Sequence, residues 1–193
     1  MRLIPISIAI MVALETPAFA HPGAGSVVSF NAGFSHPLTG LDHITAMMAV
    51  GMWAAAKGNR ATWVWPSTFL AVMLIGGALG LAHIAVPLVE PGILASVVVL
   101  GLMAALAVNP PVWVGAAIIG LFALLHGHAH GAELPEAVSG AEFVAGFASA
   151  TAALQAIGVG LALALQRSAS VPLSRAGGAL CVAVGAGLYA GVL

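Results

Sequence analysis

The sequence predicts an all-α polytopic membrane protein, a compact bundle of six transmembrane helices that follows a cleavable signal peptide. Composition predicts this class, because 61% of the 193 residues are hydrophobic and only 6% are charged. A soluble domain has about 25% charged residues. The apolar residues also fall into segments near the ~20 residues that a bilayer requires. With this composition and a net charge of -1, we expect no nucleotide-binding domain and no nucleic-acid partner.

Residues 1–20 have the three parts of a secretory signal peptide. Arg2 supplies the positive charge, residues 3–14 the apolar stretch, and Ala18–Ala20 the small-x-small cleavage site. An uncleaved first helix is the alternative, but the apolar run is short for a membrane span. We therefore expect a mature domain of residues 21–193 that begins with His21.

Six apolar segments of spanning length follow, separated by segments that contain Pro, Gly or charged residues. They cover residues 37–56, 63–84, 91–108, 111–130, 140–165 and 174–193. The segment 22–35 is too short and too rich in Gly and Ser to span, so we expect an outer lead-in or a shallow re-entrant piece. Gly76-x-x-x-Gly80 and Gly187-x-x-x-Gly191 have the spacing that lets helix backbones approach closely, which favours a compact bundle.

Loop charge predicts the orientation of these spans. If the mature N-terminus lies outside, the loops alternate between the two sides of the membrane. The basic residues of the mature chain then all fall on the cytoplasmic side, as the positive-inside rule requires: Lys57, Arg60, Arg167 and Arg175. The tryptophans map to the same interface, as an aromatic belt: Trp53, Trp63, Trp65 and Trp113. We therefore predict that both mature termini lie outside.

In this orientation all seven histidines lie on the outer half of the bundle. The first span must begin near His36, with Pro37 in its first turn, because residues 44–56 alone would cover only about 20 Å. Asp42 would then lie roughly 9 Å into the helix. His36 and His43 would share a face but stand about 10.5 Å apart along the axis. They could bind one ion directly only if the first turn were irregular.

The fourth span ends in "LLHGHAHGAELPE", which places His126, His128 and His130 at its outer end. His126 and His130 are four residues apart and share a helix face, an effective spacing for paired ligands. Neutral imidazole suits Zn, Cu, Ni and Co, and a carboxylate adds charge neutralisation. Because an aspartate at membrane depth is costly unless paired, Asp42 predicts a cationic partner.

Simpler interpretations remain open for several of these residues. His36 could cap its helix, His128 could be a solvated loop residue, and His83 is more easily explained as an interfacial residue. Met47 could extend a path of soft ligands, although methionine more often fills a core. Cys181 is the single cysteine and sits in an apolar run, so we interpret it as a buried hydrophobic residue.

Two motifs together resemble the HupE/UreJ family of nickel and cobalt permeases. The first is His36-x5-Asp42-His43 and the second runs from Leu125 to Glu133, with Leu125 where the family's motif usually has Phe. The resemblance covers essentially the whole chain. It implies Ni2+ uptake, with Co2+ possible, across a bacterial inner membrane to supply hydrogenase or urease maturation. It also implies a functional set, which is His36, Asp42, His43, His126, His130 and Glu133.

The leading hypothesis is therefore a secondary transporter, multi-pass in the inner membrane, with both mature termini periplasmic. The metal ion is its substrate, the bilayer its surroundings, and we expect no resident cofactor. The sequence implies no particular oligomeric state. We expect His21, His126, His128 and His130 to collect metal and Asp42 with His43 to form the transport site. An intramembrane zinc-dependent hydrolase that uses the His/Asp/Glu cluster is the alternative, and a haem-binding electron carrier is a third class.

Overall fold

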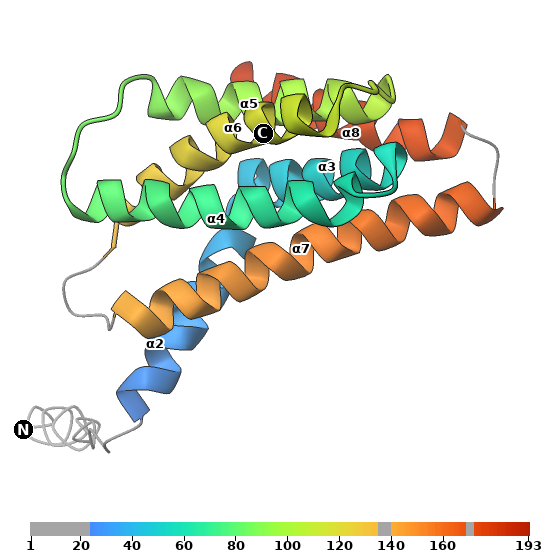
Figure 1. Ribbon diagram of the computed structural model, residues 1–193. Helices are drawn as coiled ribbons and strands as arrows, with labels where there is room; N and C mark the ends of the chain where they lie inside the picture. Colours follow the sequence, from blue (N-terminus) through green and yellow to red (C-terminus); the bar gives the residue numbers. More distant parts are fainter. Residues whose placement is uncertain (1–23, 135–139, 169–171) are drawn as a thin grey trace, which may run out of the picture.

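The protein is a bundle of α-helices (Figure 1). The computed structural model describes residues 24–134, 140–168 and 172–193, and these parts contain no β-strand. The elements are α2 (Ala24–Ser35), the 3-10 helix η1 (His36–Leu38), α3 (Leu41–Lys57), α4 (Ala61–Leu81), α5 (Val89–Ala105), α6 (Val112–Ala132), α7 (Gly140–Ser168) and α8 (Pro172–Tyr189). The expected signal peptide, residues 1–20, and the expected mature N-terminus, His21, lie outside the described residues.

The six predicted spans correspond to α3 through α8, and their predicted ends lie within four residues of the observed ends. Three of these helices, α4, α6 and α7, are long and apolar enough to cross a bilayer by length and composition. Helices α3 and α5 have 17 residues each. The segment expected to be an outer lead-in contains α2, a helix of 12 residues.

Helix α3 lies at the centre of the bundle and contacts α4, α5, α7 and α8. From Ala46 to Ala55 almost every residue is buried, with Met47 and Trp53 among the largest side chains that are fully enclosed. A helix that is apolar on all sides is stable only when it is surrounded. The residues at the N-terminal end of α3 are therefore part of a central helix that is packed against four others.

Glycines allow α4 and α6 to pack with their backbones in contact. A Cβ added at Gly76 would meet the carbonyl oxygen of Leu124, and one added at Gly127 would meet that of Met73. The predicted close approach at Gly76 is thus confirmed, and it fixes the position of the C-terminal half of α6. The prediction for Gly187-x-x-x-Gly191 is wrong, because Gly191 has φ +67 and belongs to the turn after α8. The positive φ, and not close helix packing, explains that glycine.

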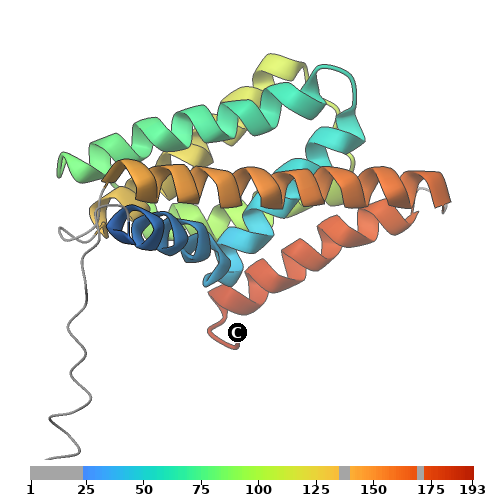
Figure 2. The ribbon, with the colours of Figure 1, turned by 90° about the horizontal axis from the view of Figure 1, so that it is seen from below.

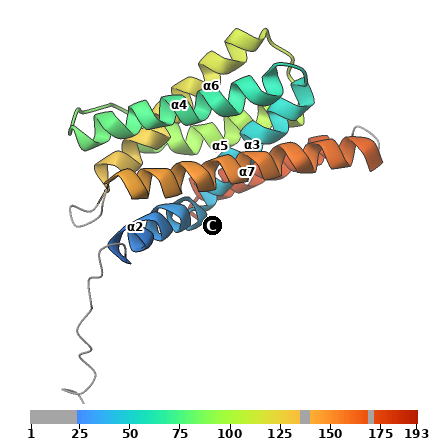
Figure 3. The same ribbon diagram turned by 60° about the horizontal axis from the view of Figure 1, so that its bottom comes forward.

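Helix α7 runs the length of the bundle, and α2 lies beside its N-terminal half (Figures 2 and 3). The two backbones approach closely, since a Cβ at Gly146 would meet the carbonyl oxygen of Phe30. This contact places η1, the element that follows α2, next to the start of α7. The N-terminal elements therefore bring His36 toward the end of α6.

The four tryptophans of the predicted belt differ in their exposure. Trp63 and Trp113 are 63% and 74% exposed, as interfacial residues should be. Trp53 and Trp65 are fully buried, and their indole N–H groups donate to the carbonyl oxygens of Val108 and Val112, each at 2.8 Å. Both bonds fasten the loop between α5 and α6 because a buried indole N–H requires an acceptor.

Candidate metal site

A break in the backbone positions the first motif. The predicted helix start near His36 is wrong: η1 covers His36–Leu38, Gly40 is extended (φ -103, ψ 124), and α3 begins at Leu41. Asp42 therefore lies in the first turn of α3, where the positive end of the helix dipole favours a carboxylate, and not 9 Å into the helix. Gly40 leaves room for this carboxylate, since a Cβ there would lie 2.5 Å from Asp42 Oδ1.

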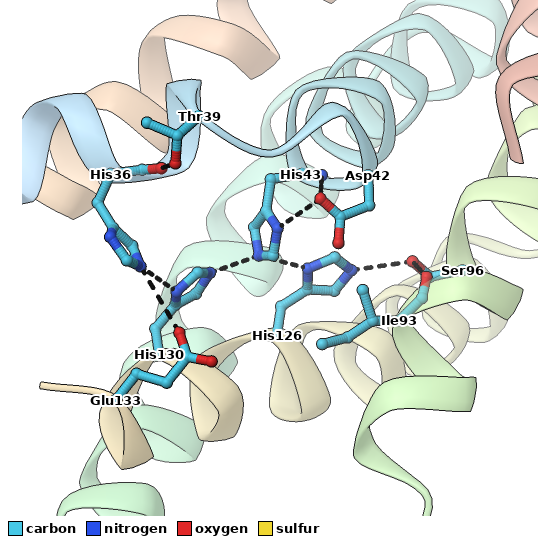
Figure 4. A network of polar contacts seen from close by, with 9 residues as sticks. All are labelled: His36, Thr39, Asp42, His43, Ile93, Ser96, His126, His130 and Glu133. Atoms are coloured by element: carbon cyan, nitrogen blue, oxygen red, sulfur yellow. Dashed lines mark hydrogen bonds and ion pairs between the residues drawn. The ribbon is translucent and has the colours of Figure 1, made fainter. Parts of the chain in front are cut away.

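Four imidazoles form one continuous chain of contacts between η1, α3 and α6 (Figure 4). His36 Nε2 lies 2.9 Å from His130 Nδ1, and His130 Nε2 contacts His43 Nε2. His43 Nε2 also lies 3.0 Å from His126 Nδ1, and His126 Nε2 lies 2.9 Å from Ser96 Oγ. The irregular first turn that the sequence left open is present, and it lets His130 bridge His36 and His43.

Hydrogen bonds to one ring nitrogen of His43 and one of His126 determine which nitrogen of each ring keeps a lone pair without a proton. Asp42 Oδ1 accepts the backbone N–H of His43 at 2.8 Å and lies 3.2 Å from its Nδ1. A carboxylate only accepts, so it fixes the proton of His43 on Nδ1. The Ser96 hydroxyl donates to the Ile93 carbonyl at 2.6 Å, so it accepts the proton of His126 Nε2. In the neutral rings, lone pairs of His43 Nε2 and His126 Nδ1 therefore face each other.

This orientation is typical of metal-binding histidines. A ligating imidazole usually donates its other N–H to a carboxylate or another oxygen, which fixes the tautomer and the ring direction. Two free lone pairs 3.0 Å apart repel unless a cation lies near both. Two nitrogens at right angles, each about 2.1 Å from one ion, are about 3.0 Å apart. The distance between His43 Nε2 and His126 Nδ1 is thus one that adjacent ligands of a transition-metal ion would have.

A second group of ligand atoms lies nearer the surface. Atoms from His36, His130 and Glu133 all lie within 4.8 Å of one another, and His36 Nε2 is 4.0 Å from Glu133 Oε2. The side chain of Glu133 is 63% exposed, whereas His43 is 6% and His126 0% exposed. The groups therefore form a series that leads from the surface into the bundle. Burial lowers the pKa of His36, which lies on η1 outside the long helices; the Glu133 carboxylate opposes this shift and His43 adds to it.

The structure adds two residues that the sequence prediction did not include. Glu90, in the first turn of α5, lines a cavity of about 190 Å³ together with His36, Asp42 and Glu133. In the sequence, Glu90 is one of several acidic residues of the predicted outer loops, and no motif indicates that it lies beside the histidines. Ser96, fully buried on α5, holds His126 as described above.

The remaining histidines stand apart from this chain of contacts. His128 donates from Nε2 to the carbonyl oxygen of Ile84 at 2.8 Å, which ties α6 to the segment after α4. His83 is exposed at the end of α4 with φ 53. His21 lies outside the described residues. The structure thus brings together His36, Asp42, His43, His126, His130 and Glu133 of the predicted set.

Comparison with known proteins shows the family of this chain. The family model described as "HupE / UreJ protein" matches residues 9–188. The chain belongs to the HupE/UreJ family. It is 45% identical to "Protein HupE" from Rhizobium leguminosarum bv. viciae over 183 residues, which are 94% of this chain and 95% of that protein. No solved structure matches the chain.

Membership of the HupE/UreJ family decides between the function classes left open by the sequence. Its members are metal transporters and not enzymes. The hydrolase and electron-carrier alternatives are therefore set aside. The spanning-length helices agree with a multi-pass membrane protein.

Proposed function

We propose that the chain is a secondary transporter that takes up a divalent transition metal ion across a bacterial inner membrane. Ni2+ is the preferred candidate and Co2+ the second, and the ion would supply hydrogenase or urease maturation. The observation that carries this proposal is the convergence of four imidazoles on one chain of contacts beside the Asp42 carboxylate. The choice of Ni2+ rests on family membership.

The inner part of the cluster is the proposed transport site. His43 Nε2 and His126 Nδ1 supply neutral nitrogen ligands. His130 contacts His43 at this inner site through Nε2 and His36 in the outer part through Nδ1. Asp42 brings negative charge next to them. That charge lowers the cost of stripping water from a dication, which neutral histidines alone do not offset.

The outer part is the proposed receiving point for ions from the periplasm. Glu133 and His36 are accessible from outside the bundle, and His130 connects them to His43. His21 would add an α-amine and an imidazole after signal cleavage. His128 would also collect metal at this outer end of α6. It would not join the chain of four imidazoles, because its Nε2–H donates to the Ile84 carbonyl.

The proposed topology has residues 1–20 as a cleaved signal and residues 21–193 as one six-span domain with both mature termini periplasmic. Two contacts support it. Lys57 contacts Asn109, and Arg175 donates to the carbonyl oxygens of Ala105 and Leu106 at 2.8 and 3.2 Å. These cations thus gather at the end of the bundle opposite the histidines, as a cytoplasmic end requires. Helix α3, about 26 Å long, can reach this interface because Lys57 extends its charge beyond the apolar segment.

A membrane potential is a sufficient driving force for this transport. A dication gains about 4.6 kcal/mol per 100 mV on moving inward, which corresponds to more than thousandfold accumulation. The test is uptake into proteoliposomes with an imposed inside-negative potential, with Ni2+, Co2+, Zn2+ and Cu2+ compared. We expect potential-dependent accumulation of Ni2+ and Co2+ by the wild type and by the control variant His83→Ala. A purified, folded chain that accumulates none of the four ions would refute the proposal.

A further inference from the structure

A line of buried side chains on α7 leads away from the histidines into the bundle. Phe147, Thr151 and Gln155 are spaced by four residues and therefore share one helix face. The ring of Phe147 lies 4.4 Å from that of His130. Thr151 is 0% and Gln155 1% exposed. This face of α7 thus begins at the metal site and continues toward the opposite end of the bundle with polar groups.

Within residues 24–134, 140–168 and 172–193, the Gln155 side chain has no hydrogen-bond partner. Neither its Oε1 nor its Nε2 is bonded, although both atoms are buried. A buried amide without partners costs free energy, and native structures contain few such groups. An amide oxygen is also a common ligand for divalent cations. The unmet oxygen is therefore available to a ligand.

Two cavities adjoin this line of side chains. The first, about 350 Å³, is lined by His130, Met73 and Phe147 among others. Met73, on α4, also contacts this face of α7, because the Thr151 hydroxyl donates to its Sδ at 3.9 Å. The second, about 340 Å³, is lined by Gln155 together with Thr62, Pro66 and Ser67. Met73 thus lines the cavity at the histidines and Gln155 the cavity at the other end, and Thr151, one turn before Gln155 on α7, donates to Met73.

The second cavity lies near the end of the bundle that carries Lys57. Thr62 is in the first turn of α4, and its hydroxyl donates to the Ala54 carbonyl of α3 at 3.5 Å. Pro66 lies inside α4 and has no N–H, so it cannot donate to the Thr62 carbonyl one turn earlier. The Thr62 carbonyl oxygen therefore lacks its usual helical donor.

We propose that Met73, Thr151 and Gln155 form an inner binding point through which a divalent metal ion passes from the histidine site to the Thr62 cavity. This inference rests on the proposed function. The donor set is one thioether, one hydroxyl and one amide oxygen, all neutral. Such ligands bind a dication far more weakly than imidazoles beside a carboxylate. Weak binding is what release requires, because conduction needs sites that ions can leave.

The test separates binding at the histidines from passage through the bundle. Equilibrium Ni2+ binding to the purified full chain in detergent reports the histidine site. The initial rate of Ni2+ uptake into proteoliposomes reports the whole route. The variants are Gln155→Leu, which removes the amide, and Thr151→Val, which removes the hydroxyl and keeps the shape. Ser149→Ala is the control, because Ser149 is exposed on the same helix and its hydroxyl donates to the Ala145 carbonyl at 2.7 Å.

We expect Gln155→Leu and Thr151→Val to slow Ni2+ uptake at least tenfold while the Ni2+ dissociation constant changes less than twofold. Ser149→Ala should match the wild type in both measurements. Uptake within twofold of the wild type in both test variants would overturn the inner point and leave the proposed function intact. If Gln155→Leu does not fold, the nearly isosteric Thr151→Val decides alone. Failure of the proposed function is distinguishable, because then the wild type itself takes up no ion.

Discussion

Replacing Ser96 by alanine tests whether His126 is held as a metal ligand. In the wild type the Ser96 hydroxyl donates to Ile93 and therefore accepts from His126 Nε2, which leaves Nδ1 free toward His43. Without the hydroxyl, the proton of the metal-free ring moves to Nδ1, where it can donate to His43 Nε2 over 3.0 Å. The metal-free state thus regains a hydrogen bond, and metal binding must break it.

The magnitude follows from that one hydrogen bond. Its net value is about 0.5–1.5 kcal/mol, and the buried Nε2–H left without an acceptor in the metal-bound state costs about 1–3 kcal/mol. The two terms add to about 1.5–4.5 kcal/mol, so we expect Ni2+ affinity to fall at least tenfold; tenfold to hundredfold is the range typical for residues that orient metal ligands. The melting temperature of the metal-free protein should change little, because its imidazole keeps a partner.

Isothermal titration of Ni2+ into the purified protein in detergent measures the affinity, and thermal unfolding without metal measures stability. Ser149→Ala, which removes an exposed hydroxyl, is the matched control. Nitrogen NMR of the histidine rings reports the tautomer directly. Unchanged Ni2+ affinity in a stable Ser96→Ala protein would refute the assignment of His126 as a ligand held by Ser96.

Substitutions at three further positions test other parts of the structure. Asp42→Asn keeps the shape and removes the charge, so Ni2+ uptake should be abolished at normal membrane levels, and Asp42→Glu should retain little; wild-type uptake by Asp42→Asn would contradict its role. His130→Ala should raise the Ni2+ concentration for half-maximal uptake at least tenfold, while His83→Ala leaves it unchanged; equal values would place the route elsewhere. Gly127→Val should lower the melting temperature sharply, because its Cβ would meet the backbone of α4, whereas Gly160→Ala, with open space around it, should not; similar melting would contradict the close packing of α4 and α6.

The approximate ends of helices α3 to α8 could be predicted from the sequence because the bilayer limits the length of apolar segments. The spacing of His126 and His130 also predicted that they share a face, and both contact His43. The start of α3 could not be predicted in this way. The stretch from His36 to Gly40 contains a proline that suits a first helical turn and a glycine that suits a break. The break at Gly40 is instead favoured by contacts between distant parts of the chain, those of α2 with α7 and of His36 with His130.

Ser96 and Gln155 show a different limit of sequence patterns. Isolated polar residues in apolar helices are expected to mark function, yet Thr68 and Ser149 also stand in such helices and merely donate to the carbonyl one turn earlier, at 2.8 and 2.7 Å. The residue types are the same, so the sequence does not separate the two groups. Hydrogen-bond partners do: the Ser96 hydroxyl reaches a histidine, and the Gln155 amide has no partner among the described residues. Polar residues whose bonding is not completed within their own helix are therefore the ones to test for a function, and only the structure identifies them.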